Sequence, residues 1–452
     1  MKSMIMDLIP TEILLQIFEY LDTPAPSEAY LHDEPSLDLL TNQPGHLRSP
    51  LKAASLVSRS WRSILLPRLF SHVLWKPDVY SLSAFTLNPI PLLRFLAEND
   101  LAHRVISFTL VVDFHDPAAI DHQVAPQIRT TDLEWLWDQL FSVIDPLRFT
   151  ICSRPTTLAA LLSCMLYLND AWFFDIPYHI LSLSRSSRQG KAKSDRTSSS
   201  LSADTRTTHA ISSRQITPSP LVTPATSSVS RCHATSSRQP APCPLFTIRP
   251  WTSLLLNEGS STKVYRVYEF YLRRPPSILG ALLGCEEFPN NVPLFPDTIV
   301  DFSYVAIFPL ASHFQILLEH LPRIDRLFVQ LQAKPESGIL ENGDEMRHID
   351  PNDLWLERDT SYTVLMRELI LSNNPRDNWR MLRVFESGDF IDSEAWELVT
   401  QIFDRRETEE WEVERPGVFI RNVGNELRSQ SGDPSDDIEE SINNLDTTAL
   451  DT

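Results

Sequence analysis

The chain has 452 residues, of which 42% are hydrophobic and 22% are charged. This length predicts two or three domains, and the apolar content is sufficient for them to bury cores. The formal net charge of −19 argues against a general nucleic-acid-binding protein, because such a protein presents a basic face to phosphate groups.

The cysteines and the N-terminus indicate an intracellular protein. The five cysteines are scattered and lack zinc-ligand spacing, which favours reduced thiols over a disulfide framework. They are Cys152, Cys164, Cys232, Cys243 and Cys285. The N-terminus lacks a basic region followed by a continuous apolar run, and the longest apolar stretch, 158–168, is too short to span a bilayer. We therefore expect a buried helix at 158–168, a cytoplasmic or nuclear location and no membrane partner.

Residues 8–22, LIPTEILLQIFEYLD, predict a short amphipathic helix. Its apolar stripe consists of Ile13, Leu14, Ile17, Phe18 and Leu21, which recur at helical intervals. Pro10 is tolerated in a first turn, and Glu12 places negative charge near the positive end of the helix dipole. A helix of this length is only marginally stable alone in water, so the stripe must pack against another part of this chain or against a partner protein.

Residues 51–70, LKAASLVSRSWRSILLPRLF, predict a second helix. The residues that share one face are Ala54, Val57, Trp61, Ile64 and Leu65. Pro67 predicts the end of this helix near Leu66, because a residue before proline is disfavoured in helical conformation.

Together, the two segments resemble the F-box motif, through which substrate receptors of SCF-type ubiquitin ligases bind a Skp-family adaptor. IPTEILLQIFEYL is similar to the opening half of the motif, and SLVSRSWRSILLPRLF is similar to its closing half. The resemblance covers residues 8–75. Ile9 stands where leucine is usual, and residues 23–50 lengthen a connection that is normally short. Their Pro, Asp and Ser content predicts an extended surface loop.

The resemblance implies that a helical face of this module lies in an apolar groove of the adaptor. It assigns adaptor contacts to Ile9, Pro10, Ile13, Leu14, Ile17, Phe18, Leu21, Leu56, Val57, Ser58 and Trp61. Some of these side chains must form the internal core of the module, and Trp61 suits either role. The alternative is that the rest of the chain covers the whole stripe.

Residues 76–184 alternate between helical and strand patterns. Leu92, Phe95 and Leu96 predict a helix, and residues 104–114 alternate as a strand. Asp132 can cap a helix over 132–144, and residues 147–151 predict the next strand.

Residues 185–245 predict a disordered basic insertion. They are rich in Ser, Thr and Pro and contain no aromatic residue, so they cannot bury enough apolar area to offset their ordering entropy. Thr217, Ser219 and Thr223 each precede proline, the pattern that proline-directed kinases read, and are candidate phosphorylation sites. An unmodified linker is the alternative.

Residues 246–423 predict the second part of the α/β region. The expected elements are a helix at 314–321 ended by Pro322, a strand at 327–331, a strand at 381–385 and a helix from Asp392. Residues 424–452 are strongly acidic and predict a disordered tail.

This succession predicts an α/β fold in which strands lie side by side with helices behind them. We expect a helical F-box module at 1–75, followed by an irregular solenoid in two parts, 76–184 and 246–423. This solenoid, in both of its parts, resembles the divergent leucine-rich-repeat region that often follows an F-box, although the asparagine-centred repeat and a constant period are missing. A compact α/β domain interrupted by the insertion is the alternative.

No catalytic, cofactor or metal site is predicted. The chain has only 11 glycines and lacks the phosphate-binding patterns GxxxxGK[ST] and GxGxxG. Cys152 and Cys164 predict buried structural cysteines, and the Cys and His residues of 232–243 lie in a segment without the packing to hold zinc. The acidic residues of 354–360 and 384–390 predict solvated helix ends or turns, in preference to a paired-carboxylate site.

These observations predict a non-enzymatic substrate receptor of an SCF-type ligase. Residues 8–75 would bind the Skp-family adaptor and, through it, cullin, while the α/β region would capture an unidentified protein substrate. Such a receptor contributes proximity, and the ligase chemistry belongs to its partners. The alternatives are a scaffold that binds the same adaptor outside any ligase, and an intracellular hydrolase whose N-terminal helices are ordinary core.

Overall fold

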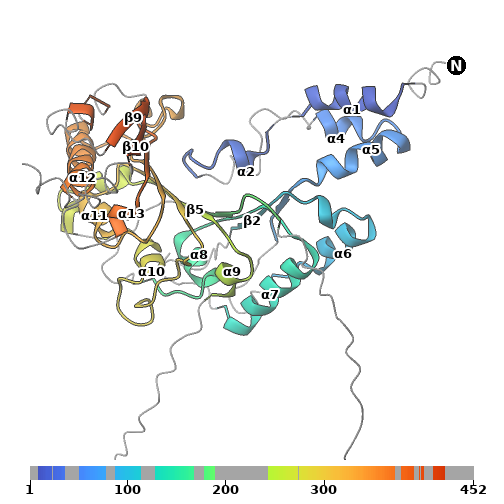
Figure 1. Cartoon of the computed structure of the whole chain (residues 1–452), viewed down its shortest axis with the longest axis horizontal. Helices are drawn as coiled ribbons and strands as arrows, with labels where there is room; N and C mark the ends of the chain where they lie inside the picture. Colours follow the sequence, from blue (N-terminus) through green and yellow to red (C-terminus); the bar gives the residue numbers. More distant parts are fainter. Residues whose placement is uncertain are drawn as a thin grey trace, which may run out of the picture. The chain divides into compact units, whose positions relative to one another are not determined.

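The structure is a computed structural model, and the part of the chain that it describes falls in one compact unit (Figure 1). The described residues are 9–22, 24–35, 50–77, 87–113, 128–166, 178–188, 243–272, 274–371, 378–390, 396–397, 399–401 and 411–422. They form an N-terminal helical module followed by an α/β region.

The helical module consists of α1 (Thr11–Tyr20), α4 (Pro50–Ala54) and α5 (Arg59–Leu69). Its small core contains Leu14, Phe18, Leu51, Ala54 and Leu65. The second helix expected from the sequence is in fact two helices, because Ser58 caps α5 by accepting a hydrogen bond from the Trp61 N–H at 3.1 Å. The expected end near Leu66 is also wrong. Pro67 lies inside the last turn of α5, where the lost backbone hydrogen bond does not stop the helix.

A ten-stranded sheet forms the centre of the α/β region, and the strands follow chain order from β1 to β8. In spatial order they are β1 (His72–Trp75), β2 (Ser107–Val112), β3 (Arg148–Ser153), β4 (His179–Ser184), β5 (Ser253–Ser260), β6 (Asp301–Ile307), β7 (Arg326–Gln330), β8 (Val384–Ser387), β10 (Val418–Arg421) and β9 (Trp411–Arg415). Strands β1 to β3 run parallel, as do β5 to β8. Strand β4 is antiparallel to both of its neighbours, and β9 and β10 add an antiparallel pair at the end.

Helices cover one face of this sheet (Figure 1). They are α6 (Ile90–Glu98), α7 (Thr130–Val143), α8 (Pro155–Leu161), α9 (Pro244–Thr247), α10 (Leu279–Leu283), α11 (Ala311–Glu319), α12 (Pro351–Leu371) and α13 (Asn378–Met381). Their buried side chains share one large core with alternate strand residues such as Phe108, Phe149 and Phe302. Crossover helices between parallel strands pack on the sheet in this way because each must bury its apolar face.

The opposite face of the sheet is crossed by residues 24–35, which we call the strap and which contain α2 (Pro26–Ala29). Leu31 of the strap is buried in a second cluster with Val111, Cys152, Ile180 and Leu255. In Figure 1, α2 lies on the side of the strands opposite α9 and α10. This interval belongs to the loop that the sequence predicted to lie on the surface, so the prediction is wrong for residues 24–35.

Polar contacts hold the strap at several strands. The Asn257 side-chain amide of β5 donates to the carbonyl oxygens of Leu31 and Asp33, at 2.9 and 2.7 Å. The His32 ring lies 4.7 Å from the Phe328 ring of β7. Lys334, beyond β7, pairs with the Asp33 carboxylate at 2.5 Å. At the other end, the Ser27 hydroxyl lies 3.2 Å from that of Ser107 on β2.

Several predicted elements are confirmed, including the strands at β2, β3 and β7 and the helices α7 and α11. The strand expected at 381–385 is displaced, because Met381 ends α13 and β8 begins at Val384. The helix expected at 158–168 is only partly correct: α8 buries most of its residues but ends at Leu161, and residues 162–166 are not helical. The α/β class is correct, but the leucine-rich-repeat interpretation stays a prediction. The reversed strand β4 and the terminal antiparallel pair depart from a regular parallel solenoid.

The boundaries of the predicted insertion shift inward. Arg185 is buried and pairs with Asp145, and Arg188 donates to the carbonyl oxygen of Val105, so both belong to the folded region. Leu245 is fully buried in the core. Most of the predicted insertion, the predicted tail and part of the helix expected from Asp392 lie outside the described residues. Within the described part, no helix combines the length and apolar content needed to cross a bilayer.

Candidate functional site

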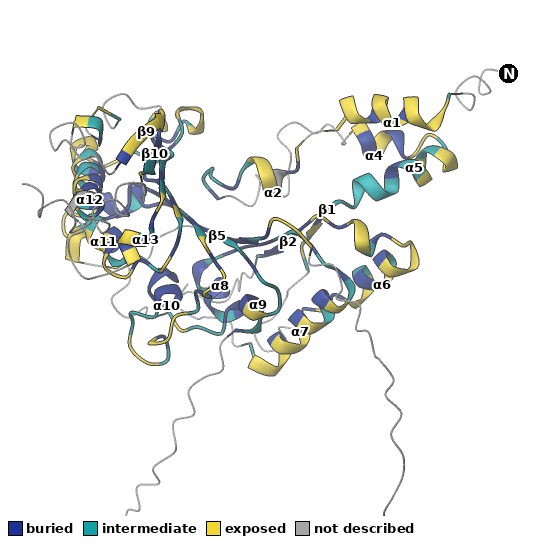
Figure 2. Ribbon diagram, in the orientation of Figure 1, coloured by how far each residue is buried: buried dark blue, intermediate teal, exposed yellow. Residues whose placement is uncertain are grey.

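Helix α1 carries two adjacent apolar stripes that face in different directions. Leu14 and Phe18 point into the module and are 5% and 0% exposed. Ile13, Ile17 and Leu21 recur every fourth residue beside them, and 46%, 45% and 36% of their surfaces are exposed. Figure 2 shows the long exposed side of α1. The module therefore completes its own core and leaves a second stripe uncovered.

The turn between α4 and α5 adds two more exposed apolar side chains. Leu56 and Val57 are 70% and 64% exposed. Their backbone N–H groups each donate a 3.1 Å bond to the end of α4, at Ala53 and Ala54. Ser58 then caps α5, so the turn is fixed at both ends. Leu56 and Val57 are thus held outward by a well-bonded backbone.

The eleven residues predicted as adaptor contacts separate into two groups. Leu14 and Phe18 are core residues, Ser58 is a helix cap, and Ile9 and Trp61 are half-buried against the core. The Trp61 ring packs edge-to-face on Phe18, with 5.1 Å between centroids. The exposed group, which we call the module surface, consists of Pro10, Ile13, Ile17, Leu21, Leu56 and Val57.

Two exposed apolar residues of α1 were missed by the sequence prediction. Leu15 is 42% exposed and Tyr20 is 91% exposed. Tyr20 lies three residues after Ile17, so the helical spacing that identified Ile13 and Ile17 could also have identified it. Leu15 lies off that stripe, and its exposure depends on where α4 and α5 pack.

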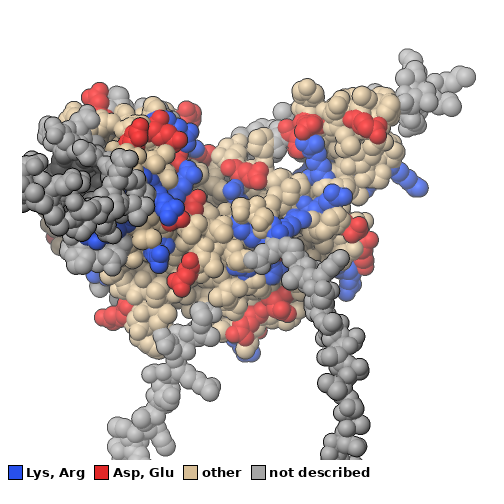
Figure 3. Space-filling view, in the orientation of Figure 1, with Lys and Arg blue, Asp and Glu red and all other residues tan. Residues whose placement is uncertain are grey.

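The module surface is poor in charge and well supported. Figure 3 shows uncharged side chains over much of the visible side of the module, with several acidic and basic side chains among them. Arg68 of α5 donates to the Asp22 carboxylate at 2.5 Å, which ties the end of α1 to α5. Exposed apolar groups gathered on a small folded module are typical of a protein-binding surface.

The thiols of Cys152, Cys164 and Cys243 lie in surroundings that disfavour nucleophilic chemistry. Burial raises the pKa values of the Cys152 and Cys164 thiols far above the usual range, which disfavours a thiolate nucleophile. Cys243 is buried and its thiol contacts the carbonyl oxygen of Leu161. Among the described residues, no group of three or more His, Cys, Asp or Glu side chains could hold a metal ion. Cys232, Thr217, Ser219 and Thr223 lie outside the described residues.

The acidic stretch at 384–390 is more ordered than the sequence predicted. Glu386 pairs with Arg326 and Arg415. Asp389 is buried and accepts hydrogen bonds from the backbone N–H groups of Leu331 and Gln332, at 2.7 and 3.1 Å. Burial raises the pKa of Asp389 to about 6, although hydrogen bonds oppose that shift. This carboxylate fastens the turn after β8 to the end of β7.

Comparison with known proteins gives one match. The family model described as F-box-like matches residues 6–76, which contain the whole helical module and β1. No curated protein and no solved structure matches the chain.

Proposed function

The chain is an F-box protein, because residues 6–76 form an F-box-like domain, and we propose that it is the substrate receptor of an SCF-type cullin ubiquitin ligase. In this role the module surface binds a Skp-family adaptor, and the α/β region binds the protein to be modified. The observation that carries the proposal is the exposed apolar stripe of α1 beside a complete internal core. Such a stripe is expected where a partner completes the burial.

The proposed contribution of this protein is proximity, without a catalytic group of its own. A receptor that holds a target near a ubiquitin carrier raises the effective concentration of the target lysine. The strap supports this role, because it joins the middle of the module to the sheet through the Asn257 and Lys334 contacts. A fixed connection limits the range of distances between the adaptor and a captured target.

The strap also narrows the choice of target-binding surface. The face of the sheet opposite the crossover helices would be a candidate surface for a partner if it were open. Here Leu31 and His32 of the strap pack on the face opposite α6 to α13, against residues of β2, β3, β4, β5 and β7. We therefore place target capture elsewhere on the α/β region.

Adaptor binding is tested with single charges placed on the module surface. We expect Ile17→Asp and Leu56→Asp each to weaken binding of a purified Skp-family adaptor about 100-fold, because the carboxylate would be desolvated in an apolar interface. Gln16→Asp, which adds the same charge at the neighbouring exposed position, should bind as the wild type does. Leu14 and Phe18 do not serve this test, because a charge there would disrupt the module core.

The measurement is a dissociation constant from isothermal titration calorimetry, with circular dichroism to check folding. Wild-type binding by both Ile17→Asp and Leu56→Asp would refute the proposed contacts. A second measurement purifies the wild-type chain from its native cell and asks what accompanies it. A ligase receptor should bring down cullin and ubiquitin conjugates, whereas a scaffold that only binds the adaptor should not.

A further inference from the structure

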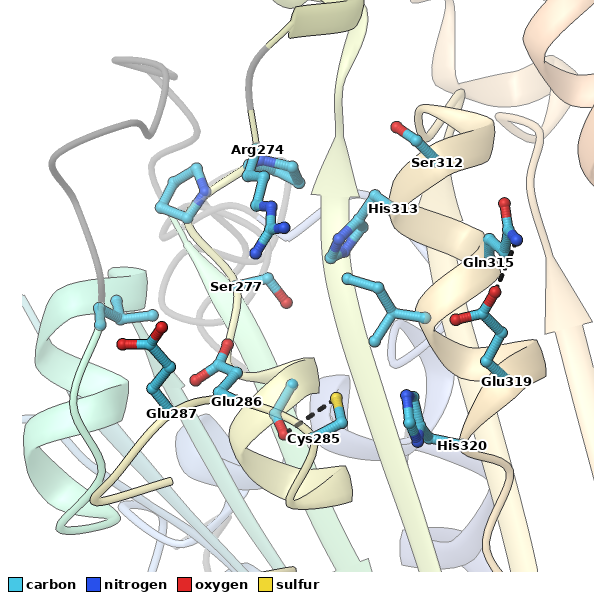
Figure 4. Close-up of a pocket in the computed structure, with 15 residues that line it drawn as sticks. Arg274, Ser277, Cys285, Glu286, Glu287, Ser312, His313, Gln315, Glu319 and His320 are labelled. Carbon is cyan, nitrogen blue, oxygen red and sulfur yellow. Dashed lines mark hydrogen bonds between the residues drawn. The ribbon is translucent and has the colours of Figure 1, made fainter. Parts of the chain in front are cut away.

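A pocket of about 650 Å³ lies between α11 and the segments that flank α10 (Figure 4). Its walls include Ser277 before α10, Glu286 after α10 and His313 on α11. This volume lies within the usual range of ligand-binding pockets and can accept one or two large side chains of a peptide.

A buried carboxylate behind the pocket lining joins two of its walls. Glu258 of β5 is 6% exposed and accepts hydrogen bonds from Ser277, from the Tyr304 hydroxyl at 2.7 Å and from His313 Nε2 at 2.9 Å. Figure 4 shows Ser277 and His313 on facing walls. Burial would raise the pKa of Glu258, but the charge of the neighbouring His313 and the hydrogen bonds from His313 and Ser277 lower it to about 2. The two walls are therefore held in place before any ligand arrives.

A second carboxylate is held at the side of the pocket. The Asn290 side-chain amide donates to Glu286 and to the carbonyl oxygen of Met165, while accepting from the Met165 N–H at 3.1 Å. Gly280 makes room for this arrangement, because a Cβ at position 280 would lie 2.3 Å from Glu286 Oε1. Burial raises the pKa of Glu286, so a cationic partner would stabilise its charged form.

The pocket has an excess of negative charge, and exposed apolar residues lie next to its lining segments in the sequence. The carboxylates of Glu286, Glu287 and Glu319 line it, against the guanidinium of Arg274. The exposed apolar residues are Met165 at 52%, Tyr271 at 57%, Leu272 at 65% and Phe288 at 57%. Exposed apolar residues near a polar pocket are typical of a surface that binds protein.

We propose that this pocket is the target-capture site and that it binds a Lys or Arg side chain of an extended target segment whose neighbouring residues are apolar. The inference rests on the proposed receptor function and names the chemistry of the target. The basic side chain enters between α10 and α11 and pairs with Glu286, while its apolar neighbours contact Leu272 and Phe288. Charge complementarity selects this occupant over an acidic or phosphorylated segment.

The test uses a phage-displayed library of short random peptides against the full chain bound to its adaptor. We expect enrichment of peptides with one Lys or Arg beside Leu, Ile or Phe. Fluorescence anisotropy of the most enriched peptide should then show binding at least about tenfold weaker for Glu286→Gln, which keeps the shape of the side chain and loses its charge. Gly280→Ala should weaken binding by moving the same carboxylate, and Glu341→Gln, at an exposed carboxylate outside the pocket, should have no effect.

The possible results distinguish a wrong pocket assignment from a wrong receptor function. Three results would show that the pocket assignment is wrong: no peptide is enriched, the enriched peptides lack a basic residue, or Glu286→Gln binds them as tightly as the wild type. If the adaptor still binds in these cases, the receptor function stands. If the wild-type chain fails to bind a Skp-family adaptor, the receptor function fails, whatever peptides the pocket selects.

Discussion

The two faces of the sheet are covered by different kinds of chain. Helices that connect successive strands cover one face, and their side chains form a continuous core with residues such as Phe108 and Phe149. The other face is crossed by the strap, which comes from inside the helical module. The helices are close in sequence to the strands that they cover, whereas the bond between Lys334 and Asp33 joins residues 301 positions apart.

This difference separates local from distant determinants of structure. A crossover helix must return the chain to the next parallel strand, so its apolar face meets the sheet almost by necessity. The strap has no such constraint, and its position depends on specific contacts of Leu31, His32 and Asp33 with the sheet. We therefore expect substitutions on the helix side to cause large losses of stability, and substitutions in the strap to cause smaller losses that leave the helix side intact.

The largest effect is expected from Phe149→Ala on the helix side. Phe149 is 1% exposed and packs against Phe108, Trp137 and Phe141, with ring centroids 5.7, 5.7 and 5.2 Å away. Its removal leaves a cavity and should lower the free energy of unfolding by about 3 to 5 kcal/mol, measured by urea denaturation. Val413→Ala, at a position 47% exposed on β9, should change it by no more than about 0.5 kcal/mol.

A smaller effect is expected from Leu31→Ala in the strap. Leu31 is 5% exposed and contacts apolar residues of several strands. We expect a loss of about 2 to 3 kcal/mol in the free energy of unfolding, and faster amide exchange in residues 24–35 than in the helix-side core. Adaptor binding by the module surface should be retained. A change below about 0.5 kcal/mol would contradict the packing of the strap on the sheet.

The smallest effect per residue is expected from pH, through one histidine on each face of the sheet. Burial lowers the pKa of His179 on the helix side to about 4, and burial together with Lys334 lowers that of His32 in the strap to about 4. Between pH 6.5 and 4 these two histidines bind protons in the unfolded chain but not in the folded chain, so their contribution to stability falls as the pH decreases. Asp389 opposes this change, because its pKa of about 6 in the folded chain lies above the ordinary value of 3.8. The His179 contribution at pH 5 is up to about 2 kcal/mol.

Urea unfolding at pH 7 and pH 5 measures this dependence. The carboxylate of Glu258 does not interfere in that window, because its lowered pKa removes stability only below its ordinary value of 4.5. His179→Asn and His32→Asn should each flatten part of the pH dependence. If His179→Asn leaves the slope of unfolding free energy against pH unchanged, His179 is protonated in the folded chain as it is in the unfolded chain.

Local patterns predicted much of the fold and part of the candidate site. Alternation at Phe108 and Leu110 identified β2, and the spacing of Leu133, Trp137 and Leu140 identified α7. Strand β4 was not predicted, and its antiparallel direction is set by its neighbours in space, β3 and β5. The long helix α12 was missed because its apolar residues do not form one clear stripe. The pocket combines residues from four separate segments, and no single segment contains a recognisable motif.

The sequence by itself determined which segments form amphipathic helices and alternating strands, because these patterns depend on neighbours two to four residues apart. It also contained both halves of the F-box motif. Only the tertiary structure decided that Leu14 and Phe18 face inward while Ile13 and Ile17 face outward, since this choice depends on where α4 and α5 pack. The strap and the pocket likewise depend on contacts between distant segments, for which local periodicity carries no information.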